Sequence, residues 1–106
     1  MNTQFKKGVL EMLVLQAIQS GDKYGYQLVN EVSKAVDVNE GTIYPILRRL
    51  SVDQYVETYL QESSEGPPRK YYHPTLKGLK YLEELRTDWD EFFAGVNGYI
   101  RKMRQD

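Results

Sequence analysis

The sequence predicts a mainly helical fold that contains one small β-hairpin and ends in a long helix. Apolar residues recur at helical spacing through roughly the first fifty residues. They alternate with polar residues after Asp53 and then follow a seven-residue repeat from Leu82 onward. At 106 residues with 41% hydrophobic content, the chain can build one modest core.

Three short helices are expected in the first half of the chain. Residues 5–20 are apolar on more than one face, as in a central core helix, and Gly21 follows as a helix stop. A second helix is expected from residue 24 to about residue 36. Tyr24 and Tyr26 at its start are interpreted as buried braces, and the alternative for Tyr26 is a contact with a phosphate. Asn39 is a favourable N-cap for a third helix. The inward stripe of that helix consists of Ile43, Leu47 and Leu50.

A β-hairpin is expected next. Polar and apolar residues alternate over residues 55–61, and a second strand is expected over residues 69–73. Residues 63–68 have the composition of an exposed turn, and we place Pro67 and Pro68 there because proline cannot donate a ladder hydrogen bond in a central strand. Three helices followed by a hairpin is the order of elements in a winged helix-turn-helix.

The last helix is expected to begin at its N-cap, Thr75, and to reach about Met103. Its apolar residues form a heptad seam that is too long to be covered by so small a core, which favours pairing with a second copy of the chain. We therefore divide the chain into a winged helix-turn-helix unit, residues 1–74, and a C-terminal dimerisation helix, residues 75–106. The predicted dimer interface contains Leu82, Leu85, Trp89, Phe92 and Val96.

The composition argues against several classes of function. The chain has no cysteine and only one histidine, His73, and it contains no recognisable catalytic constellation. We therefore predict a protein that is not an enzyme and that has no catalytic residues, no metal site and no cofactor. No apolar segment has the length of a bilayer span, so we expect a cytoplasmic protein with no membrane partner.

The outer face of the third helix is the strongest candidate for a binding surface. With Ile43 in the core, a rotation of about 100° per residue turns Tyr44, Pro45, Arg48 and Arg49 outward. Arginines can contact guanine edges or phosphates in a major groove, whereas an ordinary solvated face is the alternative. In the hairpin, basic residues beside the tip could contact phosphates or a minor groove. The candidate DNA-binding residues are Asn39, Gly41, Thr42, Tyr44, Arg48, Arg49, Arg69 and Lys70.

The formal net charge of −1 favours a second hypothesis, a dimeric winged-helix module that binds another protein and has no operator. The two hypotheses differ in where the basic side chains lie. DNA binding requires Arg48, Arg49, Arg69 and Lys70 to share one face of the molecule.

Trp89 is the candidate for binding a small molecule. A core aromatic at a dimer seam is one interpretation of its position. The other is a flat slot between two subunits, lined by Trp89, Phe92 and Phe93, that stacks an aromatic effector.

Four segments together resemble the PadR family of transcriptional regulators. They are residues 13–18 (LVLQAI), 24–28 (YGYQL), 41–50 (GTIYPILRRL) and 69–78 (RKYYHPTLKG). The resemblance implies a homodimeric repressor that binds a palindromic operator in double-stranded DNA and is often released by a small molecule. The short C-terminal portion, a single long helix, is similar to that of the compact subfamily of multidrug-binding repressors. In that subfamily a paired tryptophan at the position of Trp89 stacks on drugs. One departure is Asp53-Gln54-Tyr55, where the family usually has an acidic residue and a glycine, and we expect it to alter the start of the wing.

Overall fold

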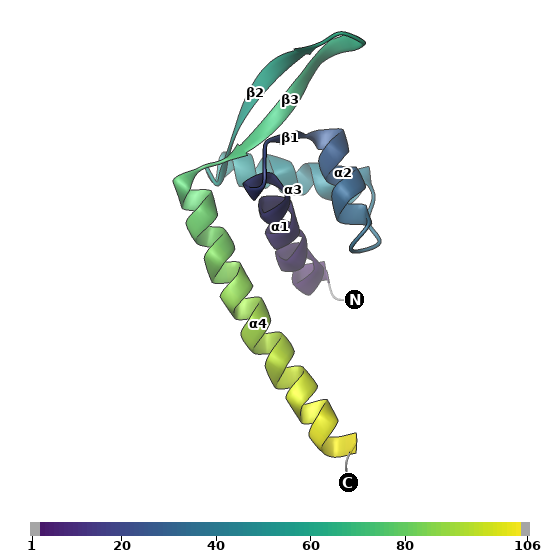
Figure 1. Ribbon diagram of the computed structural model, residues 1–106, viewed down its shortest axis with the longest axis vertical. Coiled ribbons are helices and arrows are strands. Elements are labelled where there is room, and N and C mark those ends of the chain that lie inside the picture. The colour runs from purple at the N-terminus through teal and green to yellow at the C-terminus, as the bar shows by residue number, and fades with distance from the viewer. Residues whose placement is uncertain (1–2, 105–106) are drawn as a thin grey trace.

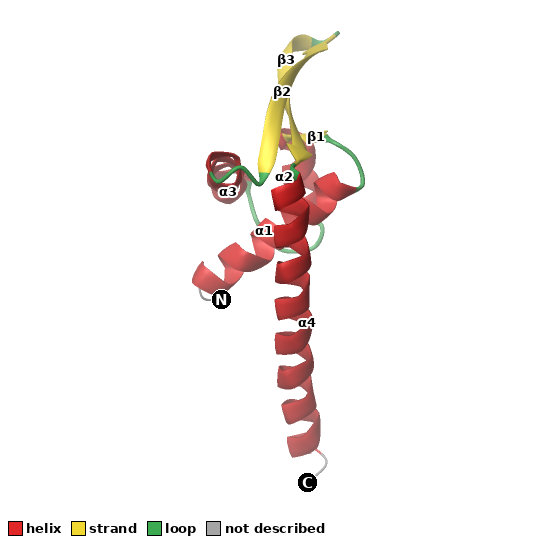
Figure 2. Cartoon of the chain, turned by 90° about the vertical axis from the view of Figure 1, so that its left-hand side faces the viewer, coloured by secondary structure: helices red, strands yellow, loops and turns green. Residues whose placement is uncertain are grey.

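The computed structural model describes residues 3–104, with side chains from residue 6 onward, and it confirms the predicted winged helix-turn-helix with a long last helix. A body of three helices carries the hairpin at one end, and the last helix runs away from it in the opposite direction (Figure 1). Turned by 90°, the hairpin and the last helix remain at opposite ends (Figure 2). The elements are α1 (Thr3–Gln19), β1 (Lys23–Tyr24), α2 (Gly25–Ser33), α3 (Glu40–Val52), β2 (Val56–Ser63), β3 (Gly66–Pro74) and α4 (Leu76–Arg104).

The core is built around α1, which contacts α2, α3, β3 and α4. Its apolar side chains are buried on several faces, as predicted for a central helix. The predicted inward stripe of α3 is confirmed, because all three of its members are fully buried. The fully buried side chains are Leu10, Val14, Leu15, Ile18, Leu28, Ile43, Leu47, Leu50 and Leu82.

The sheet contains a short strand that the sequence did not predict. β1 pairs with β3, so the strand order is β1-β3-β2 and all pairs are antiparallel. Two residues are too few to show an alternating pattern, which is why β1 was missed. The second helix is also shorter than predicted: α2 ends at Ser33, and the chain continues in turns in which Ala35 N donates to Val32 O (3.0 Å).

The wing strands extend further toward the tip than predicted. Pro67 and Pro68 lie within β3 rather than in the turn, so their placement was wrong. β1 pairs only with Tyr71 and Tyr72, and β3 therefore has a single neighbour, β2, at the level of the prolines. An open strand edge tolerates residues that lack an N–H group.

The turn between α3 and β2 takes a left-handed conformation at Gln54, whose φ is 64°. Glycine is the residue best suited to that region, and a side chain there costs roughly 1–2 kcal/mol. The backbone N–H of Tyr55 nevertheless donates to Leu50 O (2.9 Å) and closes the end of the helix. The glutamine therefore makes the turn that a glycine would make.

The start of α4 is bonded directly to this turn. The Thr75 hydroxyl donates to Gln54 O (2.7 Å) and accepts from Gly78 N (2.9 Å), which confirms Thr75 as the N-cap. Thr75 N donates to Tyr55 O (3.1 Å), and Lys77 Nζ donates to Asp53 O (2.8 Å). These bonds attach the start of α4 to the turn after α3 and fix the direction of α4 relative to α3.

Packing of α4 against α1 continues below this turn. The ring of Tyr81 stacks on Tyr55 with centroids 4.2 Å apart, and its hydroxyl donates to Glu11 (3.4 Å). Desolvation raises the pKa of the Glu11 carboxyl and raises the pKa of Tyr81 to about 12. Leu82 belongs to the core of the chain itself, so segments 1–74 and 75–106 share one core.

We predict that Gly78→Ala destabilises the protein by roughly 1–3 kcal/mol or more, because a Cβ at position 78 would overlap the carbonyl oxygen of Tyr55. Gly98→Ala in the same helix is the control. A Cβ there meets nothing within 4 Å, and alanine should stabilise the helix by up to about 1 kcal/mol. Urea unfolding followed by circular dichroism measures both changes, and equal stabilities of the two variants would contradict the close approach.

Candidate nucleic-acid interface

Helix α3 begins after Asn39, at the predicted cap position. The carbonyl of Asn39 accepts from Thr42 N (3.1 Å) and Ile43 N (3.2 Å), but its side chain makes no capping hydrogen bond. The side-chain cap was therefore wrong, and the exposed Asn39 amide remains available for other partners. Pro45 lies inside α3, which continues through it to Val52.

The predicted outer face of α3 is confirmed as exposed. Tyr44, Arg48 and Arg49 are exposed, as are Glu40 and Gly41, while Thr42 is half-buried. Glu40 lies in the first turn, where its negative charge interacts favourably with the positive end of the helix dipole.

Tyr44 is held at the edge of this face by the start of α2. Its ring lies against Gly25, and a Cβ at Gly25 would come within 2.7–3.1 Å of three ring atoms. The glycine therefore makes room for the tyrosine ring, and α2 and α3 meet through this contact.

A hollow of about 430 Å³ opens between the start of α2, α3 and the wing. Arg48 of α3 lines it together with Arg69 and Lys70 of β3, so the structure brings together three of the four basic residues that had to share a face. Arg49 is not among the lining residues. None of the described residues that line the hollow is acidic; the others are Tyr24, Gly25, Tyr26, Tyr44, Leu47, Ser51, Val52 and Tyr72.

Tyrosines form much of this surface, and the sequence analysis placed only Tyr44 of them there. Tyr26 is 58% exposed, so its prediction as a buried brace was wrong. Tyr24 is half-buried, with the guanidinium carbon of Arg69 4.5 Å from the centre of its ring. Burial raises the pKa of the Tyr72 hydroxyl, and the nearby charge of Arg48 opposes that rise. Apart from the outward position of Tyr44, the signal in the sequence for this cluster was the high tyrosine count, nine residues.

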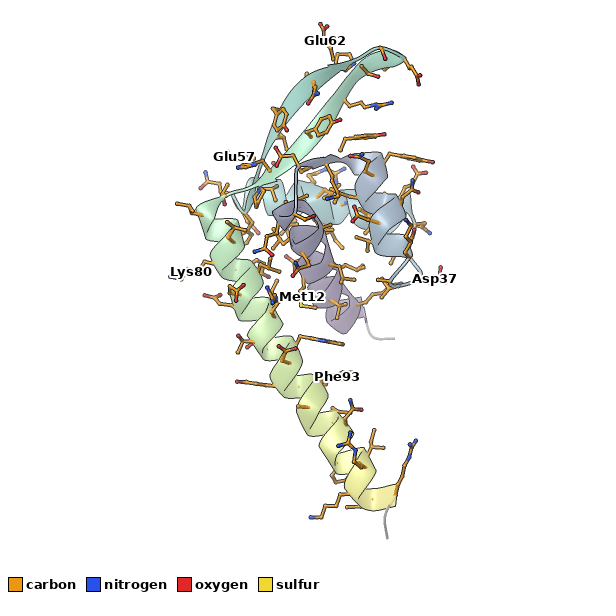
Figure 3. The ribbon with its side chains drawn as sticks, in the orientation of Figure 1. Met12, Asp37, Glu57, Glu62, Lys80 and Phe93 are labelled. Atoms are coloured by element: carbon orange, nitrogen blue, oxygen red, sulfur yellow. The ribbon has the colours of Figure 1, made fainter. Side chains whose placement is uncertain are left out.

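The wing is anchored to the body by Asp22, in the loop between α1 and β1. The hydroxyl of Tyr59 donates to Asp22 Oδ2 (2.6 Å), and His73 Nδ1 lies 2.8 Å from Asp22 Oδ1. The hydrogen bond from Tyr59 lowers the pKa of the Asp22 carboxyl, and His73 contributes in the same direction. At the other end of the hairpin, Glu62 lies near the tip and points away from the body (Figure 3).

A larger hollow, about 1150 Å³, lies at the base of the wing, but its lining has no single sign of charge. Asp22 and Glu57 contribute carboxylates there, and Lys77 contributes an ammonium. Such a mixed lining does not match a polyanion, so the smaller basic hollow is the better candidate for DNA.

Trp89 lies half-buried on α4, where the helix packs against α1. It borders a mainly apolar hollow of about 320 Å³ together with Val9 and Met12 of α1 and Leu85 and Phe92 of α4. Met12 lies between the two helices (Figure 3). The sequence prediction missed the wall made by α1, because a helix that is apolar all round gives no sign of which face stays accessible.

The apolar seam of α4 is split between the core and the surface. Leu82 is fully buried within its own chain, so it presents no side chain to a partner and its assignment to the dimer interface was wrong. Phe92, Phe93 and Val96 are 42–55% exposed, and Phe93 stacks on Trp89 with centroids 5.6 Å apart.

The described part of the chain holds neither a metal-binding cluster nor a helix that could span a membrane. Within residues 3–104 no group of three or more acidic, histidine or cysteine side chains is arranged to hold a metal ion. Among the described helices, none is both long and apolar enough to cross a membrane.

Comparison with known proteins agrees with this geometry. The model of the PadR-like transcriptional regulator family matches residues 14–84, which include α2, α3, the wing and the first part of α4. The chain belongs to this family. It is therefore a DNA-binding transcriptional regulator of the PadR type, a class of proteins that are not enzymes.

Solved structures of similar proteins share the whole architecture. A PadR-like transcriptional regulator of Bacillus cereus is 42% identical, with 92% of this chain and 97% of that chain covered and a TM-score of 0.82. A Streptococcus mutans protein is 34% identical over 90% of this chain and 89% of its own, with a TM-score of 0.84. An uncharacterized protein of Lysinibacillus sphaericus is 35% identical over 80% of this PadR chain and 82% of its own.

Proposed function

We propose that this PadR-family chain is a cytoplasmic homodimeric repressor that binds a palindromic operator and leaves it when a small aromatic effector binds. The observation that supports DNA binding at this surface is the hollow lined by Arg48, Arg69 and Lys70, whose described lining contains no acidic residue. Clustered cations attract the phosphate backbone even when the whole chain is nearly neutral.

The elements around the hollow have different tasks in this proposal. Helix α3 enters the major groove and presents Arg48 and Arg49 to base edges and phosphates. The exposed start of the helix approaches the backbone, and the wing residues Arg69 and Lys70 contact phosphates beside the groove. The proposed contacts are Asn39, Gly41, Thr42, Tyr44, Arg48, Arg49, Arg69 and Lys70.

The alternative function, a module that binds only another protein, was favoured by the net charge of −1. Segregation of the charges removes that support. All the charged side chains that line the hollow beside α3 are basic, and the described acidic side chains, Glu40 at the start of α3 among them, lie outside its lining.

We predict that Arg48→Ala weakens operator binding by roughly 1–3 kcal/mol, because the arginine makes contacts to base edges. Lys70→Ala should lower the slope of log K against log salt by about 1, since it removes one phosphate contact. Lys80→Ala is the matched control, because Lys80 lies on the side of α4 away from α1 (Figure 3) and does not line the basic hollow. Fluorescence anisotropy with labelled operator at several salt concentrations measures all three. Unchanged binding in both test variants would show that the DNA surface lies elsewhere.

A second copy of the chain is the proposed partner of α4. Beyond Phe92 the helix extends past α1 (Figure 1), and many of its exposed side chains there are apolar. Two such helices packed side by side would cover these residues, as in a coiled coil. The exposed large apolar residues from Phe92 onward are Phe92, Phe93, Val96, Tyr99, Ile100 and Met103.

We predict that Val96→Asp converts the dimer to a monomer. The substitution would bury an unpaired carboxylate in the seam, at a cost on the order of several kcal/mol. Ala94→Asp, an exposed position on the opposite side of the same helix, is the control and should leave the dimer intact. Sedimentation velocity measures the mass of each variant, and a dimer that survives Val96→Asp would refute this interface.

The proposed effector site is the hollow beside Trp89, with Phe92 and Phe93 in its surroundings. An aromatic ligand stacked on Trp89 would quench its fluorescence, and the signal has one source because the chain has a single tryptophan. To release DNA, the ligand must bind the DNA-free form of the dimer more tightly than the DNA-bound form.

We predict that planar aromatic compounds which quench Trp89 fluorescence also lower operator affinity, and that Trp89→Ala weakens their binding about tenfold or more. The reason is the loss of stacking and apolar burial. Calorimetry measures ligand binding in the variant that lacks the fluorophore. Ligands that bind the variant as tightly as the native protein would exclude the stacking site, whereas quenching without any change in operator affinity would exclude the switch.

A further inference from the structure

We propose that Tyr24 is a positioning residue that holds the guanidinium of Arg69 in place for contact with a DNA phosphate. This inference rests on the proposed DNA-binding role of Arg69. It is motivated by the contact between the Arg69 guanidinium and the Tyr24 ring, which are 4.5 Å apart from guanidinium carbon to ring centroid.

Without this contact, strand geometry would separate the two basic residues of the wing. Successive side chains of a strand point to opposite faces, so Arg69 and Lys70 leave β3 on opposite sides of the sheet. Tyr24 pairs with Tyr71, two residues from Arg69 and on the same face. The ring of Tyr24 therefore lies where the Arg69 side chain can bend over it, and both residues line the hollow.

The contact with the ring leaves the hydrogen-bonding capacity of Arg69 unused. Among the described residues Arg69 forms no salt bridge, and none of the acidic side chains lines the hollow. A cation–π contact is made through the charge of the guanidinium and the face of the ring. The N–H donors of the arginine stay available for a phosphate, which they can bind in a bidentate manner.

The ring of Tyr24 is itself held firmly. Tyr71 meets it edge-on, with centroids 5.4 Å apart and an interplanar angle of 62°. Tyr71 stacks on Tyr59 at 5.6 Å, and the Tyr59 hydroxyl is bonded to Asp22. On the backbone side, Tyr24 N donates to Gln27 Oε1 (3.1 Å).

A fixed ring changes what Arg69 loses when DNA binds. A long exposed side chain gives up rotamer freedom when it is immobilised at an interface, and part of that loss is avoided when it is already held in place. Tyr24 thus contributes to DNA affinity without touching DNA.

The test is a double-mutant cycle on operator binding with Tyr24→Leu, Arg69→Gln and the double variant, together with Tyr24→Phe. Tyr24→Leu should weaken binding roughly three- to tenfold and lower the salt slope by up to about 1, since the arginine no longer meets its phosphate reliably. Tyr24→Phe, which keeps the ring, should bind like the native protein. In the Arg69→Gln background, Tyr24→Leu should cost nothing further.

The outcomes separate this inference from the proposed function. If Arg69→Gln leaves affinity and salt slope unchanged, the role of Arg69 in DNA binding fails and this inference fails with it. If Arg69→Gln weakens binding but Tyr24→Leu does not, only the positioning role is overturned. An equal loss of operator affinity from Tyr24→Leu in both backgrounds would show that Tyr24 has a structural role that does not act through Arg69. That outcome also overturns the positioning role.

A graded series keeps the test decisive if Tyr24→Leu unfolds the chain. Phenylalanine and its mono-, di- and trifluorinated analogues at position 24 retain the shape of the ring while they withdraw electron density from its face. Operator affinity should fall stepwise with fluorination in the native background and stay level in the Arg69→Gln background. A level response in both would overturn the cation–π contact as the positioning device.

Discussion

The close approach of Gly78 to the carbonyl of Tyr55 is the constraint on which the arrangement of the molecule depends. It is possible only because position 78 has no side chain, and it brings the first turn of α4 onto the turn that ends α3. Thr75 and Lys77 then bond to the carbonyls of that turn. The helix proposed to form the dimer and the helix proposed to enter DNA are thereby joined at one point. The spacing of two recognition helices in a dimer would follow the angle between the two copies of α4.

The charges of the chain show why its total charge is a poor guide to its partner. Acidic and basic residues nearly balance, 15 against 14. A polyanion responds to the local electrostatic potential rather than to the total charge. At the hollow beside α3 the chain presents three cations, one from α3 and two from β3, and no carboxylate lines the hollow. The described acidic residues lie outside the lining of that hollow, and the one nearest the proposed contacts of α3 in the sequence is Glu40, in the first turn of the helix. A nearly neutral regulator also has weaker non-specific attraction to DNA, which leaves more of its affinity to base contacts.

Sequence patterns predicted those features that depend on periodicity. The stripe of Ile43, Leu47 and Leu50 and the cap at Thr75 are both confirmed, because each follows from local geometry. The errors arose where tertiary contacts decide. Tyr26 was expected inside, but neighbouring elements leave it exposed, and Leu82 fits a heptad seam equally well whether it packs on α1 or on a second chain.

The candidate site was predicted only in part, for the same reason. The outward side chains of α3 follow from the position of Ile43, whereas the hollow exists because β1 and the wing come alongside. No residue spacing within the sequence indicates that Tyr24 lies under Arg69, since 45 positions separate them and a two-residue strand pairing brings them together. The role of each of these residues in DNA binding stays a prediction.

The division of α4 has a consequence for how such regulators diverge. Its first turns are committed to the core through Gly78, Tyr81 and Leu82, while the part beyond Phe92 extends past α1 (Figure 1). Substitutions in the distal part can therefore change which chain pairs with which, at little cost to the folding of either. A cell that contains several paralogues of one regulator needs such independence, because mixed dimers would join two different half-site specificities on one molecule. The distal end of α4 is where selection can keep duplicated copies apart while the body and the wing stay the same.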